Sequence, residues 1–176
     1  MKEIPKIEEL EKVIKEIGNI RDRALVSFIY ITGSRVSEVV KRFKVKDIKI
    51  EKANDRIFYV FRMYVQKRRE KKEIYRMVGI PYEKNKLFID CILDYINKCK
   101  LKDNKLLFEI DRKTVYRVVK KHFGFSPHYL RHTRATHLVS EYGFTPQELK
   151  EHIGWSDIRT TSIYTHLNWK NISNKL

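Results

Sequence analysis

Apolar residues recur every three or four positions along most of the chain, with charged residues between them. Over residues 6–17 this spacing predicts an amphipathic helix, which ends at Gly18. The segment 21–31 is more uniformly apolar and is predicted to be a buried helix. By the same spacing and by their N-capping residues, further helices are predicted over residues 34–43, 84–100, 111–122, 126–143, 145–153 and 158–166.

The pattern changes over residues 56–65 and 74–81, which are rich in β-branched and aromatic residues. Such segments are typical of strands, and the charged stretch 66–73 between them predicts the tip of an antiparallel hairpin. The sequence therefore predicts a mainly α fold with a small antiparallel β-sheet, of the α+β class. No Gly/Ser linker or internal repeat interrupts the chain, so residues 1–176 are expected to form a single domain.

Composition adds an indication of the partner. The 176 residues, of which 42% are hydrophobic and 12% aromatic, suffice for one domain with a core. With 38 Lys and Arg against 22 Asp and Glu, the formal net charge is +16, so a partner with dense negative charge is expected. Nucleic acid is favoured over a membrane, because no apolar run approaches the ~20 residues of a span and no signal-peptide pattern opens the chain. The alternative is a Lys-rich surface that only confers solubility.

Cysteine usage bears on location. Cys91 and Cys99 lie eight residues apart in a predicted helix and form no CxxC pattern. We expect both thiols to be reduced and mostly buried, as in an intracellular protein. With no signal peptide, the sequence predicts a cytoplasmic location.

Arg35 is a candidate for binding an anion. Ser34 can cap a helix whose first turn carries Arg35. A positive charge there opposes the helix dipole unless an anion is bound, which favours a functional arginine over a surface one. Glu38, three residues on, can hold the guanidinium.

A second candidate lies where Ser126 and Pro127 predict the start of another helix. His128 and Arg131 stand three residues apart on one face, and an imidazole beside a two-pronged cation at a helix start suits an oxyanion such as phosphate. The alternative is an ordinary surface pair. His128 and His132 have the i, i+4 spacing of some helical zinc ligands, but no glutamate stands between them and no third ligand is evident, so neither a metal nor another cofactor is expected.

The last predicted helix carries a single tyrosine, Tyr164, flanked by threonines rather than by core residues. In this setting the tyrosine is not expected to serve core packing, and the alternative is an ordinary tyrosine. His152, in the preceding predicted helix, is interpreted as structural.

Four stretches carry a family resemblance: T-G-S-R-V-S-E from residue 32, H-x-x-R-H-T-x-A-T-H from residue 128, I-G-W-S from residue 153 and T-T-x-I-Y-T-H from residue 160. In this order and over most of the chain, they resemble the catalytic domain of tyrosine site-specific recombinases, the phage integrase and Xer-type family. The resemblance implies that family's catalytic-domain fold. It also implies an enzyme that cleaves and rejoins duplex DNA at specific sites through a covalent 3′-phosphotyrosine, without ATP or metal.

The resemblance also implies a role for each matched residue. Tyr164 would attack the phosphorus, Arg35 and Arg131 would clamp the non-bridging oxygens, and His128 would take the tyrosine proton. Trp155 stands where the family carries His or Trp and can donate its indole N–H to phosphate.

The family also places a hairpin lysine in the active site, to protonate the leaving 5′-oxygen. The usual Gly-Lys-Gly turn is missing from the tip here, so the motif itself does not select the lysine. Counting outward from the centre of the tip gives Lys67 as the first choice, with Lys71 and Lys72 behind it.

Double-stranded DNA is thus the expected partner, bound by a dimer or tetramer in the nucleoid or on viral DNA, with no membrane and no small-molecule ligand. Contacts to its backbone are predicted for Arg68, Arg69, Lys71, Lys72, Arg117, Lys120, Lys121, Arg134 and Arg159, with plain solvation as the alternative.

The family's usual N-terminal core-binding domain is expected to be absent, because the first motif begins by Thr32. Two competing functions remain: a type IB topoisomerase-like DNA-relaxing enzyme, and a catalytically inactive DNA-binding relic.

Overall fold

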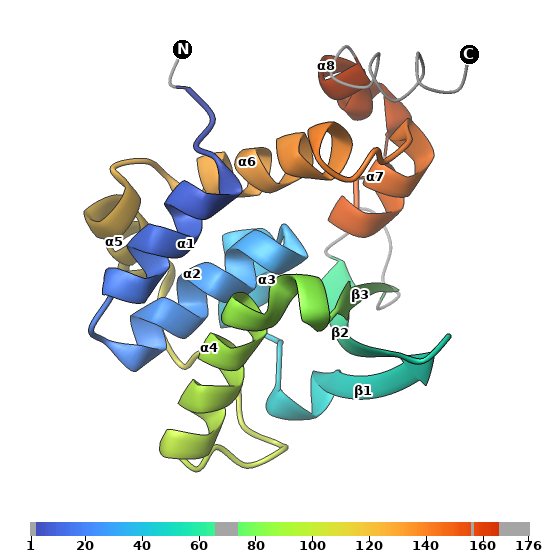
Figure 1. Cartoon of the computed structure of the whole chain (residues 1–176). Coiled ribbons are helices and arrows are strands. Elements are labelled where there is room, and N and C mark those ends of the chain that lie inside the picture. The colour runs from blue at the N-terminus through green and yellow to red at the C-terminus, as the bar shows by residue number, and fades with distance from the viewer. Residues whose placement is uncertain (1–2, 66–73, 156, 166–176) are drawn as a thin grey trace.

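The computed structural model describes residues 3–65, 74–155 and 157–165, and within them the chain is mainly helical with a three-stranded antiparallel sheet (Figure 1). The helices are α1 (Ile7–Glu16), α2 (Ile20–Thr32), α3 (Val36–Val40), α4 (Lys86–Lys98), α5 (Arg112–Phe123), α6 (Pro127–Ser140), α7 (Pro146–Ile153) and α8 (Ser162–Thr165). The strands are β1 (Ile48–Ala53), β2 (Arg56–Val65) and β3 (Ile74–Pro81). None of the described helices is long and apolar enough to cross a membrane.

Helix α2 is the centre of the core. Every residue from Ala24 to Thr32 is buried, as expected for a helix that is apolar nearly all round. It contacts α1, α4, α5 and α6, and in Figure 1 it crosses the middle of the helical part. The C-terminal end of α2 is therefore held rigidly where the chain turns into α3.

The predicted hairpin is confirmed. Strands β2 and β3 pair from Phe58↔Pro81 to Val65↔Ile74, and alternate side chains on one face are buried, as the pleat requires. Those buried on β3 are Arg76, Val78 and Ile80. The predicted tip, residues 66–73, lies outside the described residues.

Strand β1 was not predicted. It pairs with β2 as an edge strand, and all its residues after Ile48 are exposed. The residues Ile48-Lys49-Ile50-Glu51 do alternate between apolar and polar, so a short strand signal was present in the sequence and was missed. The alternation breaks at Lys52, and β1 has no buried face beyond Ile48 to reinforce it.

Some helix predictions differ from the structure. Helix α3 has five residues, and the predicted helix 158–166 begins as a 3₁₀ turn over Ile158–Thr161 before α8. Cys99, predicted to be mostly buried, is exposed because it lies at the end of α4, whereas Cys91 is buried.

Candidate active site

A tight turn between α2 and α3 presents Arg35. Gly33 ends α2 with a φ of +58°, a left-handed conformation that favours glycine. A Cβ at this position would overlap the side chain of Ile153 at the end of α7. Arg35 follows at the N-cap of α3, where its backbone N–H donates to Oε2 of Glu38 at 2.8 Å. Its Nη1 lies 3.7 Å from Oε1 of the same carboxylate, so the expected (i, i+3) contact is present.

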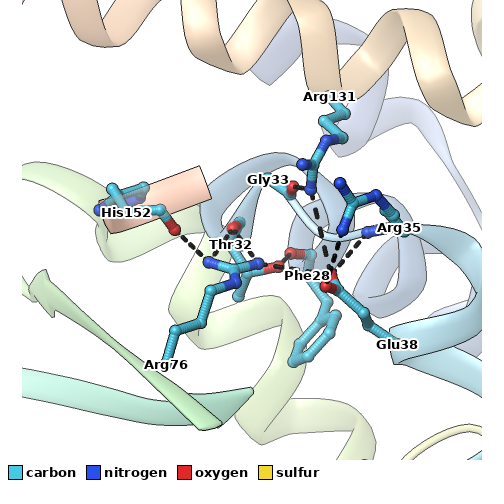
Figure 2. A network of polar contacts seen from close by, with 8 residues as sticks. All are labelled: Phe28, Thr32, Gly33, Arg35, Glu38, Arg76, Arg131 and His152. Atoms are coloured by element: carbon cyan, nitrogen blue, oxygen red, sulfur yellow. Dashed lines mark hydrogen bonds and ion pairs between the residues drawn. The ribbon is translucent and has the colours of Figure 1, made fainter. Parts of the chain in front are cut away.

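Glu38 is a buried carboxylate, 1% exposed, at the floor of the site. Two guanidinium groups besides that of Arg35 approach its Oε2 among the described residues: Nη2 of Arg76 at 3.4 Å and Nη1 of Arg131 at 4.0 Å (Figure 2). Nη1 of Arg131 also donates to the carbonyl of Gly33. One carboxylate among three cations leaves an excess of positive charge, which a bound anion would balance.

Helix α6 brings in the second arginine of the predicted clamp. The Ser126 side chain caps the helix and Pro127 begins it, as predicted. Arg131, one turn later, is 2% exposed. Burial lowers the pKa of its guanidinium to about 9, while Glu38 opposes this shift. Because the buried guanidinium of Arg131 has lost most of its hydration, an anion that binds next to it stabilises its charged form.

The predicted phosphate ligands converge on a cavity of about 1180 Å³. Arg35 from α3, His128 and Arg131 from α6 and Trp155 after α7 all line it. His128 is exposed, and the Trp155 ring lies 5.7 Å from the Cζ atom of Arg131. Four residues that span 120 positions of the sequence thus face a common space.

Tyr164 does not line this cavity. It is 4% exposed and belongs to an apolar cluster of α6, α7 and α8. Its ring stacks on Trp155 at 5.5 Å and 19°, and its Oη lies 2.5 Å from Nδ1 of His132. Burial raises the pKa of the phenol to about 12, while Arg131 opposes this shift. The expectation that this tyrosine has no packing role is wrong for this structure.

His132 is a residue of the site that the sequence reasoning missed. It was considered only as a metal ligand, although its place one turn after His128 was a signal that it shares the same helix face. Burial, and secondarily the charge of His128, lowers its pKa. A neutral imidazole can accept the hydrogen bond that the protonated phenol of Tyr164 donates.

Arg76 was also missed. It is 7% exposed, with its side chain on the same face of β3 as Val78 and Ile80. The signal was present in the sequence, because the alternation of β3 places residue 76 in the inward-facing register. An arginine in that register needs hydrogen-bond partners inside the fold.

The predicted DNA contacts fall into three groups. The hairpin contacts Arg68, Arg69, Lys71 and Lys72 lie outside the described residues, as does the predicted catalytic lysine Lys67. On α5, Arg117, Lys120 and Lys121 are exposed, and Arg159 is exposed beside Asp157, with its Nε 2.8 Å from Oδ2.

Arg134 requires a correction. It is 3% exposed, and its guanidinium lies 5.0 Å above the ring of Tyr30. A side chain buried against α2 does not reach a DNA backbone at the surface, so Arg134 is a packing residue.

His152 is half-buried and does not line the cavity, and a structural role was predicted for it. Burial lowers its pKa to about 3, so the imidazole is neutral. The ring packs edge-on against Phe144 at 5.5 Å, and the backbone carbonyl of His152 accepts a hydrogen bond from Arg76. Within the described part of the chain, no three His, Cys, Asp or Glu residues are grouped so that they could hold a metal.

Comparisons with known proteins agree with the motifs. A family model described as "Phage integrase family" matches residues 4–171. The tyrosine recombinase XerA of Pyrococcus furiosus is 30% identical over 94% of this chain and 57% of its own length. The tyrosine recombinase XerD of Staphylococcus saprophyticus is 26% identical over 95% of this chain and 60% of its own length. The chain thus spans somewhat more than half of these relatives.

Solved structures show the same fold. XerH site-specific recombinase bound to its palindromic difH substrate, a post-cleavage complex, superposes with a TM-score of 0.73 over 96% of this chain and 50% of its own, at 22% identity. The crystal structure of XerA recombinase gives a TM-score of 0.68 over 99% of this chain and 64% of its own, at 23% identity.

Proposed function

Because this chain belongs to the phage integrase family of tyrosine recombinases, we propose that it cleaves and rejoins duplex DNA at specific sites through a covalent 3′-phosphotyrosine. The observation that carries the proposal is the pair Arg35 and Arg131, which come from helices α3 and α6 to the same cavity and the same carboxylate. Residues 1–176 would act as the catalytic domain, on DNA in the cytoplasm, whether in the nucleoid or of viral origin.

The two arginines would hold the scissile phosphate. Each guanidinium presents N–H donors in a fixed fork that matches two oxygens, and its charge offsets the negative charge that develops on the non-bridging oxygens. Glu38 orients both forks before substrate arrives, so little reorganisation is needed during the reaction. The indole N–H of Trp155 would add a donor from the other side of the cavity.

Tyr164 would supply the nucleophile after leaving His132. Its Oη would form a bond to phosphorus while the bond from phosphorus to the 5′-oxygen breaks. The phenolic proton would pass to His128, which lines the cavity. The departing 5′-oxygen would take a proton from a hairpin lysine, with Lys67 as the first choice. A second 5′-hydroxyl can reverse the attack, so the strands are exchanged without ATP or metal.

Charge on α5 supports duplex DNA as the partner. Arg112 and Tyr116 line the cavity, and the exposed Arg117, Lys120 and Lys121 extend the same helix. These side chains can follow the phosphate backbone away from the scissile position. The relative XerH was solved with a DNA substrate, and by analogy we propose that this chain assembles as a dimer or tetramer on its site.

Covalent capture tests the proposal. The protein and its Tyr164→Phe variant are incubated with fragmented DNA from the source organism and denatured in detergent, and the DNA ends linked to protein are sequenced. Linked ends at one recurrent sequence are expected for the native chain and none for the variant, which should still bind DNA. Randomly distributed ends would instead indicate a topoisomerase-like enzyme. Binding with no linked ends from the native chain would indicate a relic.

A further inference from the structure

The buried guanidinium of Arg76 has no role in the chemistry described above, yet it bonds to Thr32, His152 and Glu38 (Figure 2). Its Nη1 and Nη2 each lie 3.2 Å from the carbonyl oxygen of Thr32, and Nη1 also donates to the carbonyl of His152. Its Nη2 lies 3.4 Å from Oε2 of Glu38. One side chain from the sheet thus bonds to three helical segments.

Two of these acceptors are the free carbonyls at helix ends. Thr32 is the last residue of α2, and His152 is in the last turn of α7. Carbonyls in the last turn of a helix lack partners within the helix and carry the negative end of its dipole. Arg76 therefore caps two helices at once with a positive charge.

Each capped end leads directly to a residue that lines the cavity. Beyond Thr32 the chain turns at Gly33 and presents Arg35, and beyond His152 it turns at Gly154 and presents Trp155. The third acceptor, Glu38, holds Arg35 and Arg131. The contacts of Arg76 thus fix the backbone that positions both walls of the cavity.

The fit around Arg76 is close. Gly154 has a φ of +78°, and a Cβ built on it would meet Cδ and Nε of Arg76 at 2.6 and 2.7 Å. Burial lowers the pKa of Arg76, and Glu38 opposes this shift. Its neighbours in the inward register, Val78 and Ile80, are apolar, so packing alone would be served by an apolar residue without the desolvation of a charge.

We propose that Arg76 is a positioning residue, which sets the spacing of Arg35, Arg131 and Trp155 around the phosphate by bonding α2, α3 and α7 to β3. The inference rests on the proposed function. Arg76 also lies two residues after Ile74, which pairs with Val65 at the base of the hairpin. Arg76 therefore also connects β3, the strand that follows residues 66–73 in the sequence, to Glu38, the carboxylate that contacts Arg35 and Arg131.

The test compares Arg76→Lys and Arg76→Gln with the native chain and with Arg56→Gln. Arg56→Gln is a matched control, because it removes one charge from the far end of the same sheet, where Arg56 pairs with Ala53. With duplexes recovered by covalent capture, two quantities are measured for each protein: the single-turnover rate of adduct formation at saturating DNA, and the affinity for DNA. The melting temperature of each protein is measured as well. Since misplacement by 1 Å costs about 10²-fold in rate, both Arg76 variants should lose about 10²-fold in adduct rate while folded and bound to DNA. Arg56→Gln should match the native chain.

A folded Arg76→Lys protein that forms adduct at the native rate would overturn the inference, because lysine retains the charge but cannot reproduce the fork. A rate loss fully accounted for by the fraction unfolded would overturn it as well. If Arg76→Gln does not fold, Arg76→Lys and Gly154→Ala, which crowds the guanidinium from the opposite side, provide the same comparison.

A second readout does not depend on the chemistry. The ¹⁵N and ¹H signals of the Arg35 and Arg131 Nε–H groups are followed while inorganic phosphate is titrated. The Arg76→Lys protein should need more phosphate than the native chain to shift both signals together, and equal titrations would count against positioning. Absence of adduct from the native chain would contradict the proposed function alone and would leave this measurement valid.

Discussion

The phenol oxygen of Tyr164 lies 2.5 Å from Nδ1 of His132, and the tyrosine is 4% exposed. The proposed nucleophile therefore rests in an apolar cluster beside the phosphate cavity and not within it. Because the phenol is buried with its pKa raised to about 12, it is protonated and unreactive near neutral pH. In the proposed reaction, Oη would have to leave His132 before it could reach a phosphate in the cavity.

Replacing His132 should loosen this resting position. In His132→Ala the buried hydroxyl loses its acceptor, and leaving such a group unsatisfied costs about 1–3 kcal/mol of unfolding free energy. Tyr164 should then spend more time exposed and react faster with tetranitromethane, as measured by mass spectrometry of its peptide. Tyr116, which is already 42% exposed, serves as the internal control and should react at an unchanged rate. Equal nitration of Tyr164 in both proteins would mean that the hydrogen bond does not hold the ring.

Glu38 should be among the most sensitive positions for stability. Glu38→Gln keeps the shape of the side chain but leaves the buried guanidiniums of Arg76 and Arg131 without a counter-charge. Removing one partner of a buried ion pair costs about 3–5 kcal/mol, which urea denaturation would measure. The control Glu51→Gln, on the exposed edge strand β1, should change the unfolding free energy by less than about 0.5 kcal/mol. A small loss at Glu38 would show that the guanidiniums find other compensation.

Substitutions of Arg35 and Arg131 should have similar effects on the adduct rate but different effects on the stability of the fold. The Arg35 side chain is 42% exposed and that of Arg131 is 3% exposed. Either change to Gln should lower the adduct rate by about 10²–10³-fold, the effect of removing a preorganised donor. Only Arg131→Gln should also destabilise the fold by about 3–5 kcal/mol, whereas Arg35→Gln should stay within about 0.5 kcal/mol of the native chain. Equal melting curves for the two variants would contradict the burial difference.

The pKa of Arg131, lowered to about 9, predicts a loss of activity at high pH. The clamp needs the protonated guanidinium, so kcat/KM should fall as pH rises through about 9. A bound phosphate favours the charged form and raises this pKa, so the corresponding fall in kcat should occur at higher pH. The ¹⁵N shift of Arg131 Nε, followed from neutral to alkaline pH, identifies the titrating group. An Arg131 signal that does not titrate near pH 9 would assign the activity loss to another residue.

DNA affinity should depend strongly on salt. With a net charge of +16 and an exposed basic face on α5, several phosphates should be neutralised on binding. Proteins that make about 6–10 such contacts lose about 10³–10⁵ in affinity between 50 and 200 mM salt. Fluorescence anisotropy with a labelled duplex would measure the slope, and affinity that does not change over this range would contradict backbone contact by α5.

Local chemistry made much of the fold predictable. The apolar spacing of α1, α4 and α5, the Ser126-Pro127 start of α6 and the alternation in β2 and β3 are short-range patterns, and the structure confirms them. The edge strand β1 gave only the short alternation Ile48-Lys49-Ile50-Glu51, and its residues beyond Ile48 are all exposed.

The site was predictable wherever its residues lie within one turn of each other. Arg35, the N-cap residue of α3, and Glu38 within that helix are three residues apart, and their contact followed from helix geometry. Arg76 and Glu38 are separated by 38 positions, and Arg131 and Gly33 by 98, so these contacts arise only when β3, α3 and α6 pack together. The burial of Arg134 against Tyr30 could not be predicted from the sequence either, because α6 and α2 meet only in the folded protein.

The sequence by itself thus determined most of the secondary structure, the family motifs and the residue types available for phosphate chemistry. Only the tertiary structure decided which charges are buried, which face the cavity and where Tyr164 rests. Helix and strand periodicities depend on neighbours within a few residues, whereas desolvation and ion pairing depend on segments that approach each other only in the packed core.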